Sequence, residues 1–167
     1  MSAEPALMSL VAVAKAIATK EVSSREVTRS CLHRIAEWQP RLNAFMAVEA
    51  EAALAAADAA DAALARGNAR GPLHGVPLAH KDMYYDAGHV VTCGSLIRRD
   101  FVATTTSTAL QRLKDAGTVR LGSLQMVEFR SEERRVGKEC SKQCRSDRKS
   151  TRLNSSHSKQ SRMPSSA

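Results

Sequence analysis

Apolar residues recur at helical spacing from the start of the chain. Leu10, Val13, Ala14 and Ile17 fall at positions i, i+3, i+4 and i+7, which places them on one face of a helix. Ser9 precedes them and can cap the first turn. The pattern predicts a helix that ends near Lys20.

A second helical pattern follows at once. The run Ser23-Ser24-Arg25-Glu26 has the form of a capping box, in which a serine hydroxyl and a glutamate satisfy the free N–H groups of a helix start. Val27, Cys31 and Ile35 are expected on its buried side. Gln39-Pro40 is expected to end it, because proline disfavours helical backbone in the residue before it.

The next segment is a short apolar connection, 43–48, followed by an alanine-rich stretch. The sequence predicts a helix over Glu49–Ala65 that Gly67 ends. Asp58 and Asp61 lie three residues apart and resemble a carboxylate pair. We interpret both as solvated residues on an exposed helix face.

The stretch Gly71–Asp82, GPLHGVPLAHKD, organises the rest of the chain. Proline has no N–H and a fixed φ, so Pro77 is typical of the edge or the first position of a strand. The apolar run that follows leads into Lys81, which we expect the strand to carry inward. Burial disfavours the charged form of a lysine, and a neutral amine can act as a general base. Most lysines after a strand are instead solvated surface residues.

The last regular elements alternate between helix and strand. Thr106 or Ser107 is predicted to cap a helix that ends at Gly117, and Thr118–Leu121 is predicted to form a strand. This order is typical of an α/β layer in which helices pack on a sheet. Gly122 and the pair Gly94-Ser95 are expected to form close-packed turns beside the strand that ends at Lys81.

The basic charge of the chain is confined to one end. The formal net charge is +8, but residues 1–129 hold 14 Lys and Arg against 13 Asp and Glu, and residues 130–167 hold 11 against 4. A nucleic-acid partner is therefore not expected for residues 1–129. The cysteines are Cys31, Cys93, Cys140 and Cys144, and their spacing fits neither a zinc site nor a disulfide framework.

Three ordered motifs carry a resemblance to a known family. They are GPLHGVPLAHKDMYYDAG at 71–88, TCGS at Thr92–Ser95, and LKDAGTVRLGSLQMVEF at Leu113–Phe129. Together they resemble the N-terminal part of the amidase signature family, over about residues 7–129. The resemblance implies the N-terminal portion of an α/β/α fold, with helices packed on a mixed sheet.

The resemblance also implies a chemistry. Amidase signature enzymes hydrolyse carboxamide C–N bonds with a Ser–cis-Ser–Lys triad, and the lysine of the KD motif matches Lys81. Neither a metal nor an organic cofactor is implied, and the implied partner is a small-molecule amide. The two serines belong to a Gly/Ser-rich segment that this sequence lacks, so we expect the polypeptide as printed to be inactive and marginally stable.

Some residues depart from the family pattern. Ser123-Leu124-Gln125 stands where many members have Lys-Thr-Asn, which disfavours a second interpretation, the A subunit of a tRNA-dependent amidotransferase. His80 replaces a commoner aliphatic residue and is interpreted as a packed or solvated neighbour of Lys81. Cys93 is interpreted as a small buried residue, and Tyr84 and Asp86 as pocket neighbours.

The chain changes character after Phe129. Residues 130–167 are rich in Ser, Arg and Lys without apolar periodicity, which predicts a disordered tail. Arg130–Glu133 and Asp147–Ser150 can be encoded by one nucleotide string, AGATCGGAAGAGC, in two frames. That string resembles the start of common sequencing adapters, so we hypothesise that the tail is translated adapter DNA. The alternative, a basic nucleic-acid-binding tail, lacks aromatic residues that could stack on bases.

No segment has the pattern of a signal peptide or the length of a membrane span. The expected location is the reducing cytoplasm. The sequence does not indicate an oligomeric state.

Overall fold

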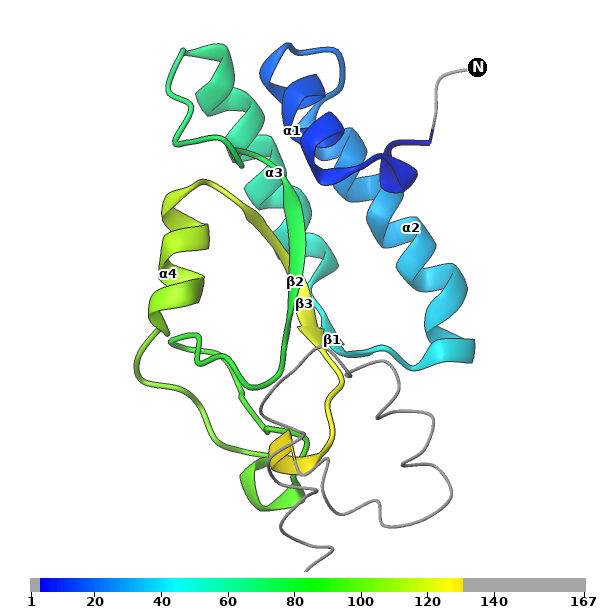
Figure 1. The fold of residues 1–167 in the computed structure, drawn as a ribbon, viewed down its shortest axis with the longest axis vertical. Coiled ribbons are helices and arrows are strands. Elements are labelled where there is room, and N and C mark those ends of the chain that lie inside the picture. Colours follow the sequence, from blue (N-terminus) through cyan, green and yellow to red (C-terminus); the bar gives the residue numbers. More distant parts are fainter. Residues whose placement is uncertain (1–3, 131–167) are drawn as a thin grey trace, which may run out of the picture. The chain divides into compact units, whose positions relative to one another are not determined.

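The computed structural model describes residues 4–130. Within them, two consecutive helices are followed by strands and helices that alternate along the chain (Figure 1), and short 3-10 helices lie at both ends and in one loop. The helices are α1 (Leu10–Ala18), α2 (Ser24–Leu42), α3 (Ala50–Ala65) and α4 (Thr108–Asp115), the strands are β1 (Phe45–Val48), β2 (Pro77–Lys81) and β3 (Val119–Leu124), and the 3-10 helices are η1 (Pro5–Leu7), η2 (Leu96–Arg98) and η3 (Glu128–Arg130).

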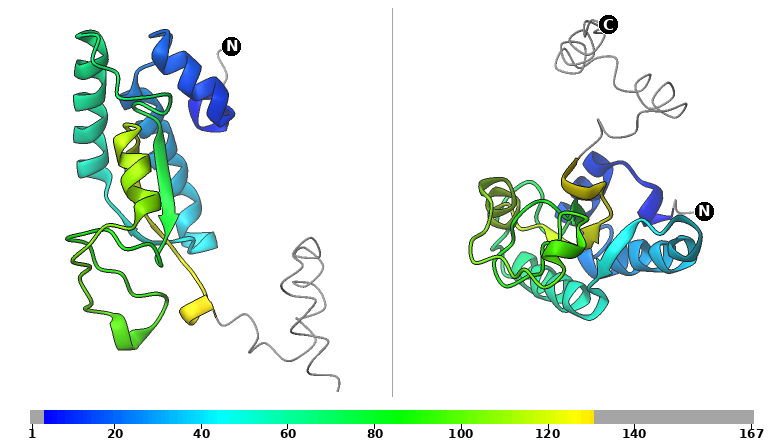
Figure 2. Two further views of the ribbon diagram at one scale, coloured as in Figure 1. Left: turned by 60° about the vertical axis from the view of Figure 1, so that its left-hand side comes forward. Right: turned by 90° about the horizontal axis from the view of Figure 1, so that it is seen from below.

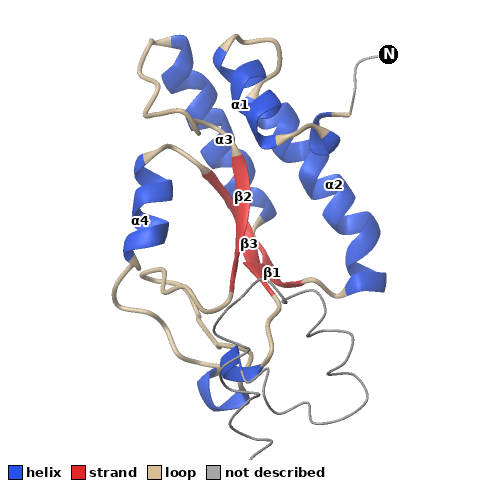
Figure 3. Cartoon of the chain, viewed as in Figure 1, coloured by secondary structure: helices blue, strands red, loops and turns tan. Residues whose placement is uncertain are grey.

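The strands form one mixed sheet in the order β1-β3-β2. β2 runs parallel to β3, with Pro77 opposite Val119 and Lys81 opposite Leu124, and β1 runs antiparallel to β3. Helices α2 and α3 pack against one face of this sheet (Figures 2 and 3), where Ala53 and Ala57 are fully buried against β3. Helix α4 lies on the other side of β2 from α2 (Figure 1). The predicted α/β class, with helices packed on a mixed sheet, is confirmed.

The predicted side-chain caps of α1 and α2 are confirmed, whereas at α4 Ser107 is the N-cap residue but its hydroxyl makes no capping hydrogen bond. The Ser9 hydroxyl accepts the Ala12 N–H at 3.2 Å at the start of α1. The capping box of α2 is complete: the Ser23 hydroxyl accepts the Glu26 N–H, and the Glu26 carboxylate accepts the Ser23 N–H at 2.8 Å. This backbone hydrogen bond from Ser23 lowers the pKa of Glu26.

Two expectations about helix ends and helix faces were wrong. Helix α2 continues through Pro40 to Leu42 and ends at Asn43, which has a left-handed backbone. The side chain of Gln39 braces this end, since it both donates to and accepts from the backbone of Phe45, at 2.8 and 3.0 Å. Asp61 is not merely solvated: its carboxylate accepts the N–H groups of Ser24 and Arg25 and so caps α2 from α3.

The loop before β2 is fixed by His74 and two glycines. The His74 ring is buried, and it contacts the Ala60 carbonyl at 2.9 Å and the Arg70 N–H at 3.3 Å. Gly117 packs against this ring so closely that a Cβ there would lie 2.8 Å from Nδ1. The Gly75 N–H donates to the Gly117 carbonyl at 2.8 Å. The first half of the stretch 71–82 therefore ties α3, β2 and the end of α4 together.

Gly122 lies inside β3 and not in a turn, so that part of the expectation was wrong. It pairs with Ala79 on one side and Val48 on the other. A Cβ at Gly122 would lie 2.0 Å from the Ala47 carbonyl oxygen, so only glycine allows β1 to approach this closely. The predicted strand therefore continues past Leu121 to Leu124.

The predicted disordered tail and the hypothesis of translated adapter DNA concern residues 130–167, of which 131–167 lie outside the described residues. Within residues 4–130, none of the helices combines the length and the apolar character that crossing a bilayer requires.

Candidate active site

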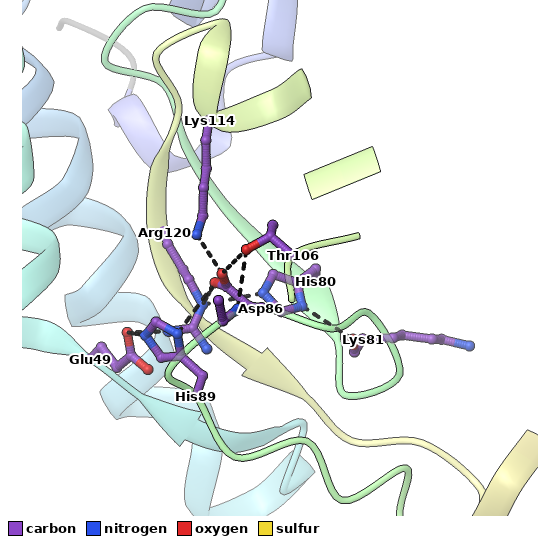
Figure 4. A network of polar contacts seen from close by, with 9 residues as sticks. Glu49, His80, Lys81, Asp86, His89, Thr106, Lys114 and Arg120 are labelled. Atoms are coloured by element: carbon purple, nitrogen blue, oxygen red, sulfur yellow. Dashed lines mark hydrogen bonds and ion pairs between the residues drawn. The ribbon is translucent and has the colours of Figure 1, made fainter. Parts of the chain in front are cut away.

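Lys81 is the last residue of β2, and its side chain is exposed. The expectation that the strand would carry it inward was wrong. Side chains alternate between the two faces of a strand, and the buried neighbour is His80. Figure 4 shows Lys81 pointing away from the polar cluster that surrounds His80. Within residues 4–130 the Lys81 ammonium has no hydrogen bond or ion pair.

On the opposite face, a buried ion network surrounds Asp86, which is 1% exposed (Figure 4). The Lys114 ammonium donates to Asp86 Oδ1, and Arg120 Nε lies 3.6 Å from Oδ2. Arg120 also pairs with Glu49, the residue before α3. The network joins the loop after β2, α4, β3 and the start of α3, so we interpret Asp86 as a structural anchor.

The electrostatics of Asp86 follow from these contacts. Burial raises the pKa of its carboxyl, but the Lys114 hydrogen bond and the positive charges around it outweigh burial, so the net shift of the pKa is downward. His89 contributes to this field, with Nδ1 3.5 Å from Asp86 Oδ2.

His80 bridges the network and the backbone of Lys81. It is 9% exposed, its Nε2 lies 3.2 Å from Arg120 Nε, and its Nδ1 lies 3.1 Å from the Lys81 carbonyl oxygen. Burial lowers the pKa of His80, and the nearby Arg120 charge lowers it further. The interpretation of His80 as a packed neighbour of Lys81 is confirmed. Tyr84 stacks edge-on to this ring at 6.4 Å.

Asp82 organises the loop on the other side of Lys81. Its carboxylate, 2% exposed, accepts the Thr92 N–H at 3.0 Å and also accepts the Thr92 hydroxyl. The Asp82 carbonyl accepts the Cys93 N–H at 3.0 Å. The residue after Lys81 therefore holds the turn that begins at Thr92.

The Thr92–Ser95 turn also contacts the segment after β3. A Cβ on Gly94 would lie 2.6 Å from the Met126 carbonyl oxygen, and the Ser95 hydroxyl donates to Glu128 at 2.7 Å. Cys93 is buried in a small apolar cluster with Val91 and Ala103, which confirms its interpretation as a small buried residue. The three motifs of the sequence thus meet at one end of the parallel strand pair.

Sequence reasoning did not find Arg120, Lys114 or Thr92 as partners. The only signal was an arginine inside an otherwise apolar strand, between Val119 and Leu121. In the described part of the chain, no cluster of His, Cys, Asp and Glu could hold a metal ion.

This arrangement can be compared with known proteins. The family model described as Amidase matches residues 26–133. The chain belongs to the amidase family. Within it, the chain is 51% identical over 115 residues to a protein of Azoarcus sp. (strain BH72) named as the A subunit of glutamyl-tRNA(Gln) amidotransferase, a match that covers 69% of this chain and 23% of that protein.

Solved amidase structures share the fold. The peptide amidase of Stenotrophomonas maltophilia superimposes with a TM-score of 0.68 at 32% identity, over 74% of this chain and 26% of that one. A fatty acid amide hydrolase superimposes with a TM-score of 0.71 over 76% of this chain and 23% of the other, and at 23% identity this likeness shows the fold alone. The chain spans about a quarter of the length of the relatives it matches.

Proposed function

We propose that this amidase-family chain belongs to an enzyme that cleaves carboxamide C–N bonds. Lys81 is its general base. The observation that carries the proposal is the placement of Lys81. Its side-chain nitrogen has no polar partner among residues 4–130, and it lies at the end of a parallel strand between two neighbours that are buried and hydrogen-bonded. The backbone of such a lysine is held in place, and its side-chain nitrogen is free to exchange a proton.

The proposed steps follow the chemistry of the family resemblance. Lys81 takes a proton through a bridging serine, which activates a second serine as the nucleophile. That serine attacks the amide carbonyl carbon, the C–N bond breaks, and the amine leaves with the proton that Lys81 had taken. Backbone N–H groups stabilise the oxyanion, and water releases the acid from the acyl-enzyme. The printed sequence contains no Gly/Ser-rich segment of the kind that holds both serines.

The test is hydrolysis of small carboxamides by the complete protein. We expect Lys81→Ala to lower kcat by about 10²–10⁴-fold, the usual contribution of a positioned base. Lys15→Ala, which removes another lysine, on α1, is the matched control and should leave kcat unchanged. An active Lys81→Ala protein would refute the proposal.

A second candidate is the A subunit of an amidotransferase. Several relatives that carry that name are 43–51% identical to this chain, whereas the peptide amidase is 32% identical. In this case glutamine would be the amide, and partner subunits would use the released ammonia. Glutaminase activity that rises when partner subunits are added would favour this candidate over a free-standing amidase.

We also propose the division of the chain into an amidase part, residues 1–129, and a tail, 130–167, that is not native. Resequencing the source DNA across the codons of Phe129 and Arg130 with different library chemistry tests this. A frame that runs from MVEF into a Gly/Ser-rich segment supports the division, and true coding of the tail contradicts it.

A cytoplasmic location is proposed as well, supported by Cys31 and Cys93 being free thiols.

A further inference from the structure

We propose that His80 is a positioning residue for Lys81, a neutral imidazole that carries its proton on Nδ1 and ties the Lys81 carbonyl to the partly buried Arg120. The inference rests on the proposed role of Lys81 and adds a residue to it. His80 stands where the family pattern commonly has an aliphatic side chain, which could make neither contact.

The two hydrogen bonds select one tautomer. A guanidinium has only donors, so Arg120 Nε–H donates to His80 Nε2 at 3.2 Å, and Nε2 must be the bare nitrogen. The neutral ring then has its proton on Nδ1, which donates to the Lys81 carbonyl at 3.1 Å. A single state of the ring satisfies both contacts.

Arg120 is a firm anchor for this bridge. It pairs with Glu49 before α3 and lies beside Asp86, which Lys114 of α4 holds in turn. The ring of His80 therefore connects the end of β2 to side chains from four other segments of the chain. Because its Nε2 is occupied by Arg120, His80 is not available as the base of the reaction.

The contact fixes the backbone from which the Lys81 side chain projects. The Lys81 carbonyl also accepts the N–H groups of Met83 at 2.8 Å and Tyr84 at 3.3 Å, and the Asp82 N–H donates to Leu124 at 3.0 Å. His80 supplies the only side chain among the described residues that bonds to this carbonyl. A general base must be held within a fraction of an ångström to transfer a proton efficiently.

Protonation would break the bridge. A doubly protonated ring has an N–H on Nε2, which would face the Arg120 Nε–H without an acceptor between them. The charged and titratable groups that face His80 are Arg120 from β3, and Asp82, Tyr84 and Asp86 from the loop, with Lys114 of α4 behind Asp86. Burial lowers the pKa of His80 and opposes protonation near neutral pH.

The first test is nitrogen NMR of the full 167-residue chain with labelled histidine and a ¹³C label on the Lys81 carbonyl. We expect a protonated Nδ1 and a bare Nε2 at about pH 7, and a Lys81 carbonyl shift that moves at the same pH as the His80 ring. A ring protonated on Nε2, or a carbonyl that does not follow the ring, would overturn the inference.

The second test uses the complete protein and separates the inference from the proposed function. His80→Leu, which cannot bond to either partner, should lower kcat by about 10–10²-fold with KM little changed. His80→Asn can still donate to the Lys81 carbonyl and should recover part of the loss. Wild-type kcat in His80→Leu overturns the inference even where Lys81→Ala is inactive. An active Lys81→Ala protein overturns the proposed function and leaves the hydrogen-bonded bridge to be judged by NMR.

Discussion

The two faces of the chain at the end of β2 differ sharply. On one face, the buried His80 and Asp86 and the partly buried Arg120 form a connected set of hydrogen bonds and ion pairs. On the other, Lys81 projects into solvent with no polar partner among residues 4–130. The His80 face is closed by polar contacts within residues 4–130, whereas the other face presents the Lys81 side chain to solvent. The difference shows that the polar contacts of the fold hold the backbone at Lys81 and leave its side-chain nitrogen unpaired among these residues.

The largest expected effect comes from removing the anchor of the buried face. Asp86→Ala leaves Arg120 and Lys114 without their shared carboxylate, and breaking a buried ion pair from one side costs about 3–5 kcal/mol. The free energy of unfolding, measured with urea, should fall by about that amount. Asp58→Ala removes a surface ion pair with Arg25 and serves as the control, with an expected loss of about 0–1 kcal/mol. Equal losses in both variants would show that the network is no stronger than a surface pair.

A smaller loss is expected for the second buried carboxylate. Asp82→Ala leaves the N–H and hydroxyl of Thr92 without an acceptor, which should cost about 1–3 kcal/mol. The Thr92–Ser95 turn should also lose protection against amide hydrogen exchange. Asp100→Ala, at an exposed position, should change neither quantity. Unchanged exchange in the turn of Asp82→Ala would contradict the role given to Asp82.

The pH dependence of stability probes the same face. The pKa of His80 is lower in the folded chain than the ordinary value of about 6.5, so below that pH the unfolded state binds more protons. Its contribution is complete above about pH 6.5 and is lost as the pH falls through the folded pKa, by at most about 1.4 kcal/mol per pH unit. Asp86, with a lowered pKa, contributes above its unfolded value of 3.8 and loses that contribution at lower pH.

Urea unfolding between about pH 7 and about pH 5 checks the histidine part. His80→Gln retains an acceptor for Arg120 but does not titrate, so its stability should change less over this interval than that of the wild type. The inference of a desolvated neutral His80 fails if both proteins lose stability equally.

The smallest effect is expected on the open face. Lys81→Ala removes an exposed side chain without partners among the described residues, so the free energy of unfolding should change by no more than about 0.5 kcal/mol. Thermal unfolding of the full chain measures this. A large loss of stability would mean that Lys81 has a structural role, and it would remove the contrast between the two faces.

Local sequence patterns predicted the elements whose causes are local. The capping box at Ser23 and the proline at the start of β2 depend on residues within a few positions of one another, and both are found as predicted. The end of α2 was missed because Gln39 braces it through the backbone of Phe45, across the helix boundary.

The candidate site also has features that local sequence determines and features that depend on distant contacts. The sequence by itself determined that Lys81 ends a strand and that three motifs belong together, because residue order and spacing carry that information. Only the tertiary structure decided that the His80 side of β2 is buried and that the Lys81 side is exposed. Asp61, Asp86 and Arg120 took their roles from partners that are distant in sequence: 36 and 37 residues separate Asp61 from the N–H groups it caps, and 40 separate Arg120 from His80. A charged group is stable in the interior only beside such partners, and no local pattern specifies where the fold will bring them.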